Sequence, residues 1–171
     1  LTSLTRWSAI ASCLAARVTC SSLMALSMAL AVQNLIVGLG AIGSHGVSHV
    51  ARMAAVTEVT VVDPDRYEPK NLRAQNISRT DVGRSKAQAQ ARRIALVNQG
   101  VHVRPYHGRI EDMPLGRLRA DVILGCVDSR RARMAINQAA WRLGVPWINA
   151  GVDADGLLTR VQVFQPSSEA P

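Results

Sequence analysis

The chain has 171 residues, of which 48% are apolar and 19% are charged, the balance of one globular domain rather than of a disordered or collagen-like chain. The net charge is +8, and all but two of the lysines and arginines are arginines. These basic residues are interspersed with acidic ones, and only 4% of the residues are aromatic. With few side chains to stack on bases, this composition excludes a typical nucleic-acid binder and favours phosphates or acidic partners. Three cysteines without a C-x-x-C pair indicate a reducing compartment and no zinc site.

Residues 1–33 differ in composition from the rest of the chain. They contain no acidic residue and only two arginines, and their apolar run at 23–32 is ten residues long, too short for a membrane span of about 20. Three interpretations stay open: a cleaved secretory or transit segment, an N-terminal helix packed on the domain, and a start site placed upstream of the true one. We expect the main domain to cover residues 34–171, with no membrane partner.

The first predicted elements form a strand, a tight turn and a helix. An apolar run at 34–37 leads into Gly38-Leu-Gly40-Ala-Ile-Gly43, and apolar residues then recur at helical spacing. A second strand at 58–62 ends at Asp63-Pro64-Asp65. The polar stretch that follows has about fifteen residues, a length typical of a functional loop.

The rest of the chain continues this alternation. Helices are predicted over about 81–99 and 130–143, each followed by a glycine, and strands over 101–106, 121–126, 145–148 and 157–164. Strands that alternate with helices in this way imply right-handed crossovers. The predicted fold class is α/β, a Rossmann-like doubly wound, mostly parallel sheet with helices on both faces, and its ligand is expected at the carboxyl ends of the strands.

The turn after the first strand carries a phosphate-binding pattern. Gly38, Gly40 and Gly43 have the spacing G-x-G-x-x-G, which lets the backbone turn sharply and brings its amides and a helix N-terminus to a phosphate. Asp63 follows Gly43 by 20 residues, at the end of the second strand, where a carboxylate accepts hydrogen bonds from ribose hydroxyls. The pattern predicts a bound nucleotide, which NAD, FAD and ATP would all satisfy.

The polar stretch after Asp65 favours ATP over NAD. A dehydrogenase needs little at this point, whereas this chain carries Arg66, Lys70, Asn71, Arg73, Gln75 and Arg79, followed by Arg84 and Lys86. Side chains such as Asn71, Arg73 and Lys86 are suited to hold the β- and γ-phosphates and to neutralise charge in a transition state. Asp128, after the fourth strand, is expected to face the same crevice and to bind Mg²⁺ together with phosphate oxygens.

Taken in order, these residues resemble the ThiF/MoeB/HesA superfamily, the adenylation domain shared with ubiquitin-activating enzymes. The resemblance covers about residues 34–165. It is carried by the following pieces of the sequence: Gly38-Leu-Gly40-Ala-Ile-Gly43, Val62-Asp63-Pro-Asp65, Asn71-Leu72-x-x-Gln75, Val82-Gly83-x-x-Lys86, Cys126-x-Asp128 with Arg133 and Asn137, and the strand pair at 151–164.

The resemblance implies a MgATP-dependent enzyme, usually a homodimer, that adenylates the C-terminal glycine of a ubiquitin-like or sulfur-carrier protein and releases pyrophosphate. The cysteine usage and the need for a nucleoside triphosphate predict a cytoplasmic location. The resemblance also implies that Asp63 holds the ribose, Asn71 and Lys86 the phosphates, and Asp128 the magnesium ion. From the polar stretch and the resemblance together, we expect Arg73, Lys86 and Asp128 to be the catalytic groups. The expected cofactor-binding residues are Gly38, Gly40, Gly43, Asp63, Asp65, Asn71, Arg73, Gln75, Lys86 and Asp128.

The sequence departs from the family pattern in three places. Ala74 stands where the family has an arginine, with Arg73 one position earlier, and residues 1–33 show no version of the arginine that many members supply to a neighbouring subunit. The zinc-binding C-x-x-C pair expected after Phe164 is also missing, which favours a C-terminally truncated domain over a minimal member. Two alternatives therefore stay open: an NAD-dependent oxidoreductase and a non-catalytic ATP-binding partner subunit.

Overall fold

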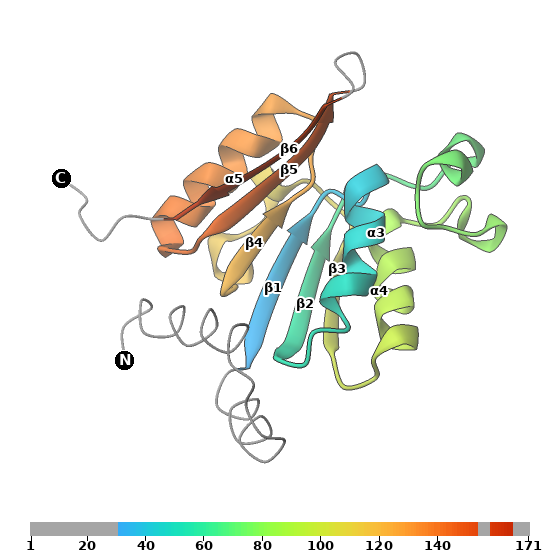
Figure 1. Cartoon of the computed structure of the whole chain (residues 1–171), viewed down its shortest axis with the longest axis horizontal. Helices are drawn as coiled ribbons and strands as arrows, with labels where there is room; N and C mark the ends of the chain where they lie inside the picture. The colour runs from blue at the N-terminus through green and yellow to red at the C-terminus, as the bar shows by residue number, and fades with distance from the viewer. Residues whose placement is uncertain (1–30, 154–157, 166–171) are drawn as a thin grey trace. The chain divides into compact units, whose positions relative to one another are not determined.

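The structure, a computed structural model, describes residues 31–153 and 158–165 (Figure 1). The expectations for the N-terminal segment and for the end of the chain concern residues that lie almost entirely outside this part. Among the described residues, no helix is long and apolar enough to cross a membrane.

Six strands form one sheet with the order β3-β2-β1-β4-β5-β6. The first five are parallel to one another, and β6 runs antiparallel to β5 at the edge. Their bounds are β1 (Val32–Val37), β2 (Val56–Val62), β3 (His102–Tyr106), β4 (Val122–Gly125), β5 (Trp147–Asp153) and β6 (Leu158–Phe164). The order reverses between β1 and β4, and a doubly wound sheet places its ligand crevice at such a reversal.

Both faces of the sheet are covered, as the sequence predicted. Helices α3 (Ala41–Val50) and α4 (Lys86–Val97) cover one face, and α5 (Arg130–Leu143) covers the other (Figure 1). Side chains alternate along β1, so Ile36 packs in the cluster under α3 and α4 while Leu35 and Val37 pack in the cluster under α5. The last three residues of β1, Leu35–Val37, are buried on both faces of the sheet and are all apolar, whereas the polar Gln33 and Asn34 precede them.

The loop between β2 and α4 corrects the helix predicted over 81–99. That helix begins only at Lys86, and the preceding residues form two short 3-10 helices, η1 (Pro69–Arg73) and η2 (Arg79–Asp81). Gly83 adopts a φ of +84°, a conformation that breaks an α-helix and that side-chain-bearing residues rarely adopt. The polar stretch is therefore a structured loop whose ends are joined by the bridge between Arg66 and Ser85.

The strand predicted over 145–148 is also wrong in its bounds, since β5 starts at Trp147 and continues to Asp153. Val145 and Pro146 belong to the turn after α5. The Val145 N–H donates to the carbonyl of Ala140, and Gly144 ends the helix with a φ of +63°. The two remaining 3-10 helices, η3 (Ile110–Asp112) and η4 (Leu115–Arg117), lie between β3 and β4.

Candidate nucleotide-binding site

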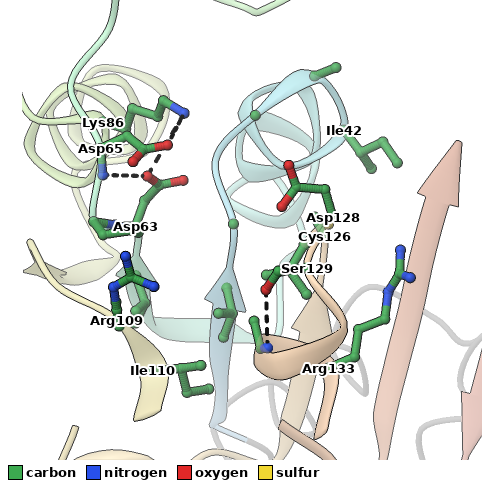
Figure 2. A pocket seen from close by; sticks show the side chains of 18 of the residues that line it. Ile42, Asp63, Asp65, Lys86, Arg109, Ile110, Cys126, Asp128, Ser129 and Arg133 are labelled. Atoms are coloured by element: carbon green, nitrogen blue, oxygen red, sulfur yellow. Dashed lines mark hydrogen bonds and ion pairs between the residues drawn. The ribbon is translucent and has the colours of Figure 1, made fainter. Parts of the chain in front are cut away.

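A pocket of about 380 Å³ opens where the parallel strands end (Figure 2). Its walls are the turn from β1 into α3, the segments that follow β2 and β3, the segment from β4 into α5, and part of β5. The pocket therefore lies at the reversal of strand order, the position that the predicted fold assigns to a ligand.

The glycine-rich turn forms one wall of the pocket. Gly38 has a φ of +87°, and a Cβ placed on it would lie 2.5 Å from the carbonyl oxygen of Cys126. A Cβ on Gly43 would collide with the carbonyl oxygen of Gly38, whereas a Cβ on Gly40 would meet nothing within 4 Å. Gly38 and Gly43 thus allow the turn to pack closely, and Gly40 leaves open space where α3 begins.

Asp63 lies beside the glycine turn, directly after β2, and is only 4% exposed. Its Oδ2 accepts a hydrogen bond from the Leu39 N–H at 2.7 Å, and its Oδ1 accepts one from the Asp65 N–H at 2.8 Å. Burial raises the pKa of the Asp63 carboxyl, an effect that these hydrogen bonds and the charge of Lys86 counteract only in part. Each oxygen keeps a further lone pair, so the carboxylate can still accept hydrogen bonds from a ligand.

Lys86, the first residue of α4, brings a positive charge close to Asp63. Its Nζ lies 2.9 Å from Asp65 Oδ2 and 3.9 Å from Asp63 Oδ1, and its side chain is 10% exposed. The ammonium group also lies 5.9 Å from the centre of the Tyr67 ring. The two acids and the ring hold Lys86 at the edge of the pocket, across from Asp128 (Figure 2).

Asp128 lies at the opposite side, in the segment that leads into α5. It is exposed, and the next residue, Ser129, caps the helix by accepting a hydrogen bond from the Ala132 N–H at 3.1 Å. No group of three or more His, Cys, Asp or Glu side chains in the described part of the chain could hold a metal ion. A single exposed carboxylate fits Mg²⁺ shared with phosphate oxygens and water, and does not fit a metal held by protein ligands alone.

The structure brings together most of the predicted site residues, but not all of them. The pocket is lined by Gly38, Gly40, Asp63, Asp65, Gln75, Lys86 and Asp128. Gly43 packs behind the turn, and Asn71 and Arg73 are not among the lining residues. The Oδ1 of Asn71 accepts a hydrogen bond from the Glu68 N–H at 2.8 Å within η1, and Arg73 is exposed at the end of that helix.

Sequence reasoning missed Arg109 and Glu111, which line the pocket from the segment after β3. The sequence could have indicated them, because the parallel strands of such a sheet all end at the same edge. The segment after the strand predicted at 101–106 therefore belongs beside the ligand. Arg133, named only as part of the family resemblance, lines the pocket from the first turn of α5. Figure 2 shows Arg109 and Arg133 on opposite sides of the pocket.

Two polar atoms at this pocket have no partner within the described structure. They are Oε1 of Gln75 and Nε of Arg133, both buried and both belonging to lining residues. Buried polar atoms without a partner cost stability unless a ligand or water satisfies them. The glycine turn, the buried acid and these unsatisfied atoms fit a polar ligand with phosphate and hydroxyl groups.

Comparison with known proteins decides the family. Residues 22–170 match the model of the ThiF family. The chain belongs to the ThiF family. The match begins inside the segment 1–33 that its composition sets apart.

Among curated relatives of this ThiF-family chain is ubiquitin-like modifier-activating enzyme 5 of Dictyostelium discoideum, with 30% identity over an alignment of 150 residues. The match covers 80% of this chain and 39% of the relative. The enzyme of the same name from Oryza sativa is 29% identical over 79% of this chain and 35% of its own length. The chain thus spans less than half the length of these relatives.

Solved structures show the same ThiF-type fold. Escherichia coli MccB in a crystal structure with ATP superposes with a TM-score of 0.69 and 26% identity, over 80% of this chain and 42% of MccB. The Escherichia coli tRNA N6-threonylcarbamoyladenosine dehydratase TcdA superposes with a TM-score of 0.63 and 23% identity, over 69% of this chain and 51% of TcdA. The second likeness shows the fold alone.

Proposed function

We propose that this domain binds MgATP and adenylates the C-terminal glycine of a ubiquitin-like or sulfur-carrier protein, with release of pyrophosphate. The observation that carries the proposal is one pocket, in a chain of the ThiF family, that combines the glycine turn, Asp63, Lys86 and Asp128. The curated relatives are named as enzymes that activate ubiquitin-like modifiers, and MccB has been crystallised with ATP.

The pocket offers places for the phosphates and the ribose of ATP and for its metal ion. The amides of the glycine turn and the N-terminus of α3 suit the phosphates, and the Asp63 carboxylate suits the ribose hydroxyls. Lys86 and Arg109 supply positive charge, and Gln75 supplies a buried oxygen that lacks a partner. Asp128 would hold Mg²⁺, which supplies charge neutralisation for the phosphates when it is bound.

The reaction needs positioning and charge neutralisation rather than a catalytic nucleophile of the enzyme. A carboxylate oxygen of the partner's terminal glycine attacks the α-phosphorus of ATP, and a bond forms between them. The bond from the α-phosphorus to the bridging oxygen breaks, and pyrophosphate leaves with that electron pair. No proton has to move, which agrees with a pocket whose Cys126 has its pKa raised by burial to about 11.

The two alternatives differ in how well they are supported. The NAD-dependent oxidoreductase depends only on the glycine turn and Asp63, which ATP-binding members of the ThiF family also need, so the family match favours adenylation. A non-catalytic ATP-binding partner subunit is the second candidate. Ala74 in place of the family's arginine, and Arg73 lying outside the pocket wall, favour it.

Pyrophosphate exchange separates these candidates. The chain is incubated with MgATP, labelled pyrophosphate and a carrier protein that ends in Gly-Gly, and label is followed into ATP. We expect exchange in the wild type and its loss in Asp128→Asn, with no loss in the control Asp112→Asn, an exposed acid of η3 that does not line the pocket. ATP binding without exchange selects the inactive subunit, and binding of NADH but not ATP selects the oxidoreductase.

Further expectations concern the oligomeric state, the location and the partners. We expect a homodimer, which light scattering during size-exclusion chromatography tests, and a cytoplasmic location, where ATP is abundant. We expect neither a nucleic acid nor a membrane among the partners, and the +8 net charge makes a salt-dependent filter-binding assay with DNA the appropriate check.

A further inference from the structure

The peptide groups around Leu39 are held from two sides. The Leu39 N–H donates to Asp63 Oδ2 at 2.7 Å, and the Leu39 carbonyl accepts a hydrogen bond from the Tyr67 hydroxyl at 3.0 Å. Leu39 is the residue between Gly38 and Gly40, and it is fully buried. Its two hydrogen bonds therefore fix the backbone at the centre of the glycine turn.

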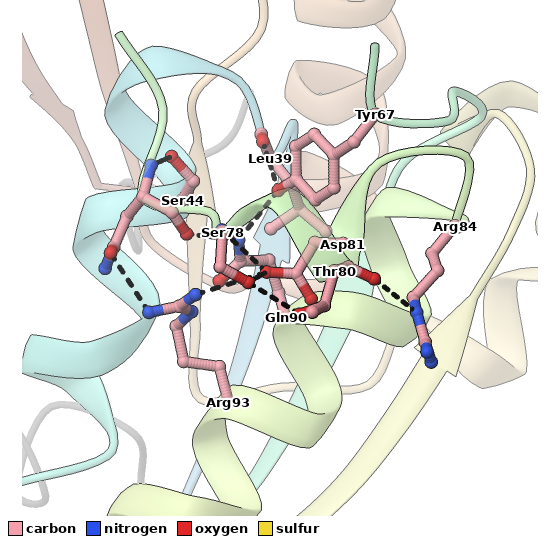
Figure 3. A network of polar contacts seen from close by, with 10 residues as sticks. Leu39, Ser44, Tyr67, Ser78, Thr80, Asp81, Arg84, Gln90 and Arg93 are labelled. Carbon is pink, nitrogen blue, oxygen red and sulfur yellow. Dashed lines mark hydrogen bonds and ion pairs between the residues drawn. The ribbon is translucent and has the colours of Figure 1, made fainter. Parts of the chain in front are cut away.

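The Tyr67 hydroxyl is itself oriented by a second buried side chain. Gln90, from the middle of α4, donates from Nε2 to the Tyr67 oxygen at 2.7 Å and to the Asn76 carbonyl at 3.2 Å (Figure 3). Tyr67 is 1% exposed and Gln90 is fully buried. Because the amide of Gln90 can only donate at this atom, the hydroxyl must accept from it and keep its own proton for the Leu39 carbonyl.

Holding this carbonyl also sets the direction of a free amide. In a planar trans peptide the C=O of Leu39 and the N–H of Gly40 point in opposite directions. Gly40 lines the pocket, and no described residue accepts a hydrogen bond from its N–H. With the carbonyl turned to Tyr67, the Gly40 N–H is left available for an anion.

We propose that Tyr67 and Gln90 are positioning residues that hold the glycine turn in the conformation that binds the ATP phosphates. This inference rests on the proposed binding of ATP. Neither side chain lines the pocket. Their effect is transmitted through the Leu39 carbonyl, so it should concern the phosphates and not the nucleoside.

The test compares Tyr67→Phe and Gln90→Met with the control Asn98→Ala. Asn98 follows the last residue of α4, donates from Nδ2 to the Ala51 carbonyl at 3.0 Å and accepts at Oδ1 from the Gly100 N–H at 2.9 Å. The control therefore also removes hydrogen bonds between side chain and backbone, away from the pocket. ATP and adenosine affinities are measured for each protein. We expect Tyr67→Phe and Gln90→Met to bind ATP about two- to tenfold more weakly, the range of one hydrogen bond, with adenosine binding unchanged.

Equal losses for ATP and adenosine, or no loss of ATP affinity in Tyr67→Phe, would overturn the inference. If the wild type binds no ATP, the proposed function fails, and amide hydrogen exchange of the peptide 38–44 still decides about the positioning. Faster exchange of this peptide in Tyr67→Phe than in the wild type, with no such increase in Asn98→Ala, supports the positioning role. Unchanged exchange in Tyr67→Phe contradicts it.

Discussion

Gly38 and Gly40 are two residues apart in one turn, but a methyl group would meet different surroundings at each. At Gly38 it would strike the Cys126 carbonyl and require an L-residue at a φ of +87°. At Gly40 it would enter open space at the pocket. The first glycine is therefore needed for folding, and the second for room beside a ligand.

We predict that an alanine at Gly38 mainly lowers stability and that an alanine at Gly40 mainly weakens ATP binding. Gly38→Ala should lower the free energy of unfolding by about 1–3 kcal/mol, the cost of a strained backbone. Gly40→Ala should lose less stability than Gly38→Ala, because its Cβ would meet no atom within 4 Å, but should bind ATP more weakly. Thermal unfolding and ATP titration of both variants check this, and a Gly38→Ala protein as stable as the wild type would contradict it.

Cys126 also lines the pocket, and its chemistry is set by burial. Burial raises the pKa of its thiol to about 11, so only about one molecule in ten thousand carries the thiolate at neutral pH. We predict that Cys126→Ala retains pyrophosphate exchange. Mass spectrometry should also find that iodoacetamide alkylates Cys126 in the native protein more slowly than in the unfolded protein. Loss of exchange in the alanine variant, with ATP binding intact, would assign the thiol a catalytic role.

At the scale of elements, the loop between β2 and α4 is fixed by polar contacts rather than by apolar packing. Asp81, at the end of η2, accepts hydrogen bonds from the Ser78 N–H and Oγ, each at 2.8 Å, and lies 3.5 Å from Arg93 of α4 (Figure 3). Burial alone would raise the pKa of Asp81, but these hydrogen bonds and the nearby arginines lower it below its usual value. The ionised carboxylate therefore stabilises the loop.

This shift predicts how the contribution of Asp81 depends on pH. A carboxyl whose pKa is lower in the folded state stabilises the protein above its unfolded pKa of about 3.8, and this stabilisation is lost as the pH falls through the folded value. We expect Asp81→Asn to be less stable than the wild type by about 1 kcal/mol at pH 6, and the difference to shrink below about pH 4. Urea unfolding at several pH values measures it, and a constant difference would contradict the assignment.

The elements that the sequence predicted best are those fixed by local pattern. The glycine that ends α5 and the apolar runs of the central strands gave both type and position, because periodicity and caps are short-range signals. The start of α4 was placed several residues too early, because the residues before it form η2 and a turn in which Gly83 has a positive φ.

The predicted site residues also divide into those placed by the topology of the sheet and those placed by contacts distant in the sequence. Those at strand ends, such as Asp63 and Asp128, line the pocket because the topology alone brings strand ends together. Asn71 and Arg73 lie within a 3-10 helix whose placement depends on contacts distant in the sequence, such as the hydrogen bond from the Asn76 N–H to Ser44 Oγ. Arg109 was missed because no motif marks it.

At the scale of the domain formed by the described residues, the two apolar clusters lie on opposite faces of one sheet. Ile94 of α4 belongs to the first cluster and Ile136 of α5 to the second, and both are fully buried. Because β1 sends alternate side chains into each cluster, the two clusters share the central strand. The pocket is lined by residues of α3 and α4, which cover one face of the sheet, and of α5, which covers the other, so ATP binding should stabilise the domain as one unit.

We therefore predict one cooperative unfolding transition that responds equally to damage on either face. Ile94→Ala and Ile136→Ala should each lower the free energy of unfolding by about 2–5 kcal/mol, the cost of a buried cavity. The matched controls are Leu96→Ala on α4 and Met134→Ala on α5. These residues are 87% and 57% exposed, so both variants should unfold like the wild type.

Two probes follow the unfolding of the domain. Circular dichroism reports the secondary structure as a whole, and with Trp7 and Trp141 replaced by phenylalanine, fluorescence reports Trp147 in the second cluster. The two probes should give coincident curves even in Ile94→Ala, and a Trp147 transition that stays at the wild-type midpoint there would mean that the two faces unfold independently.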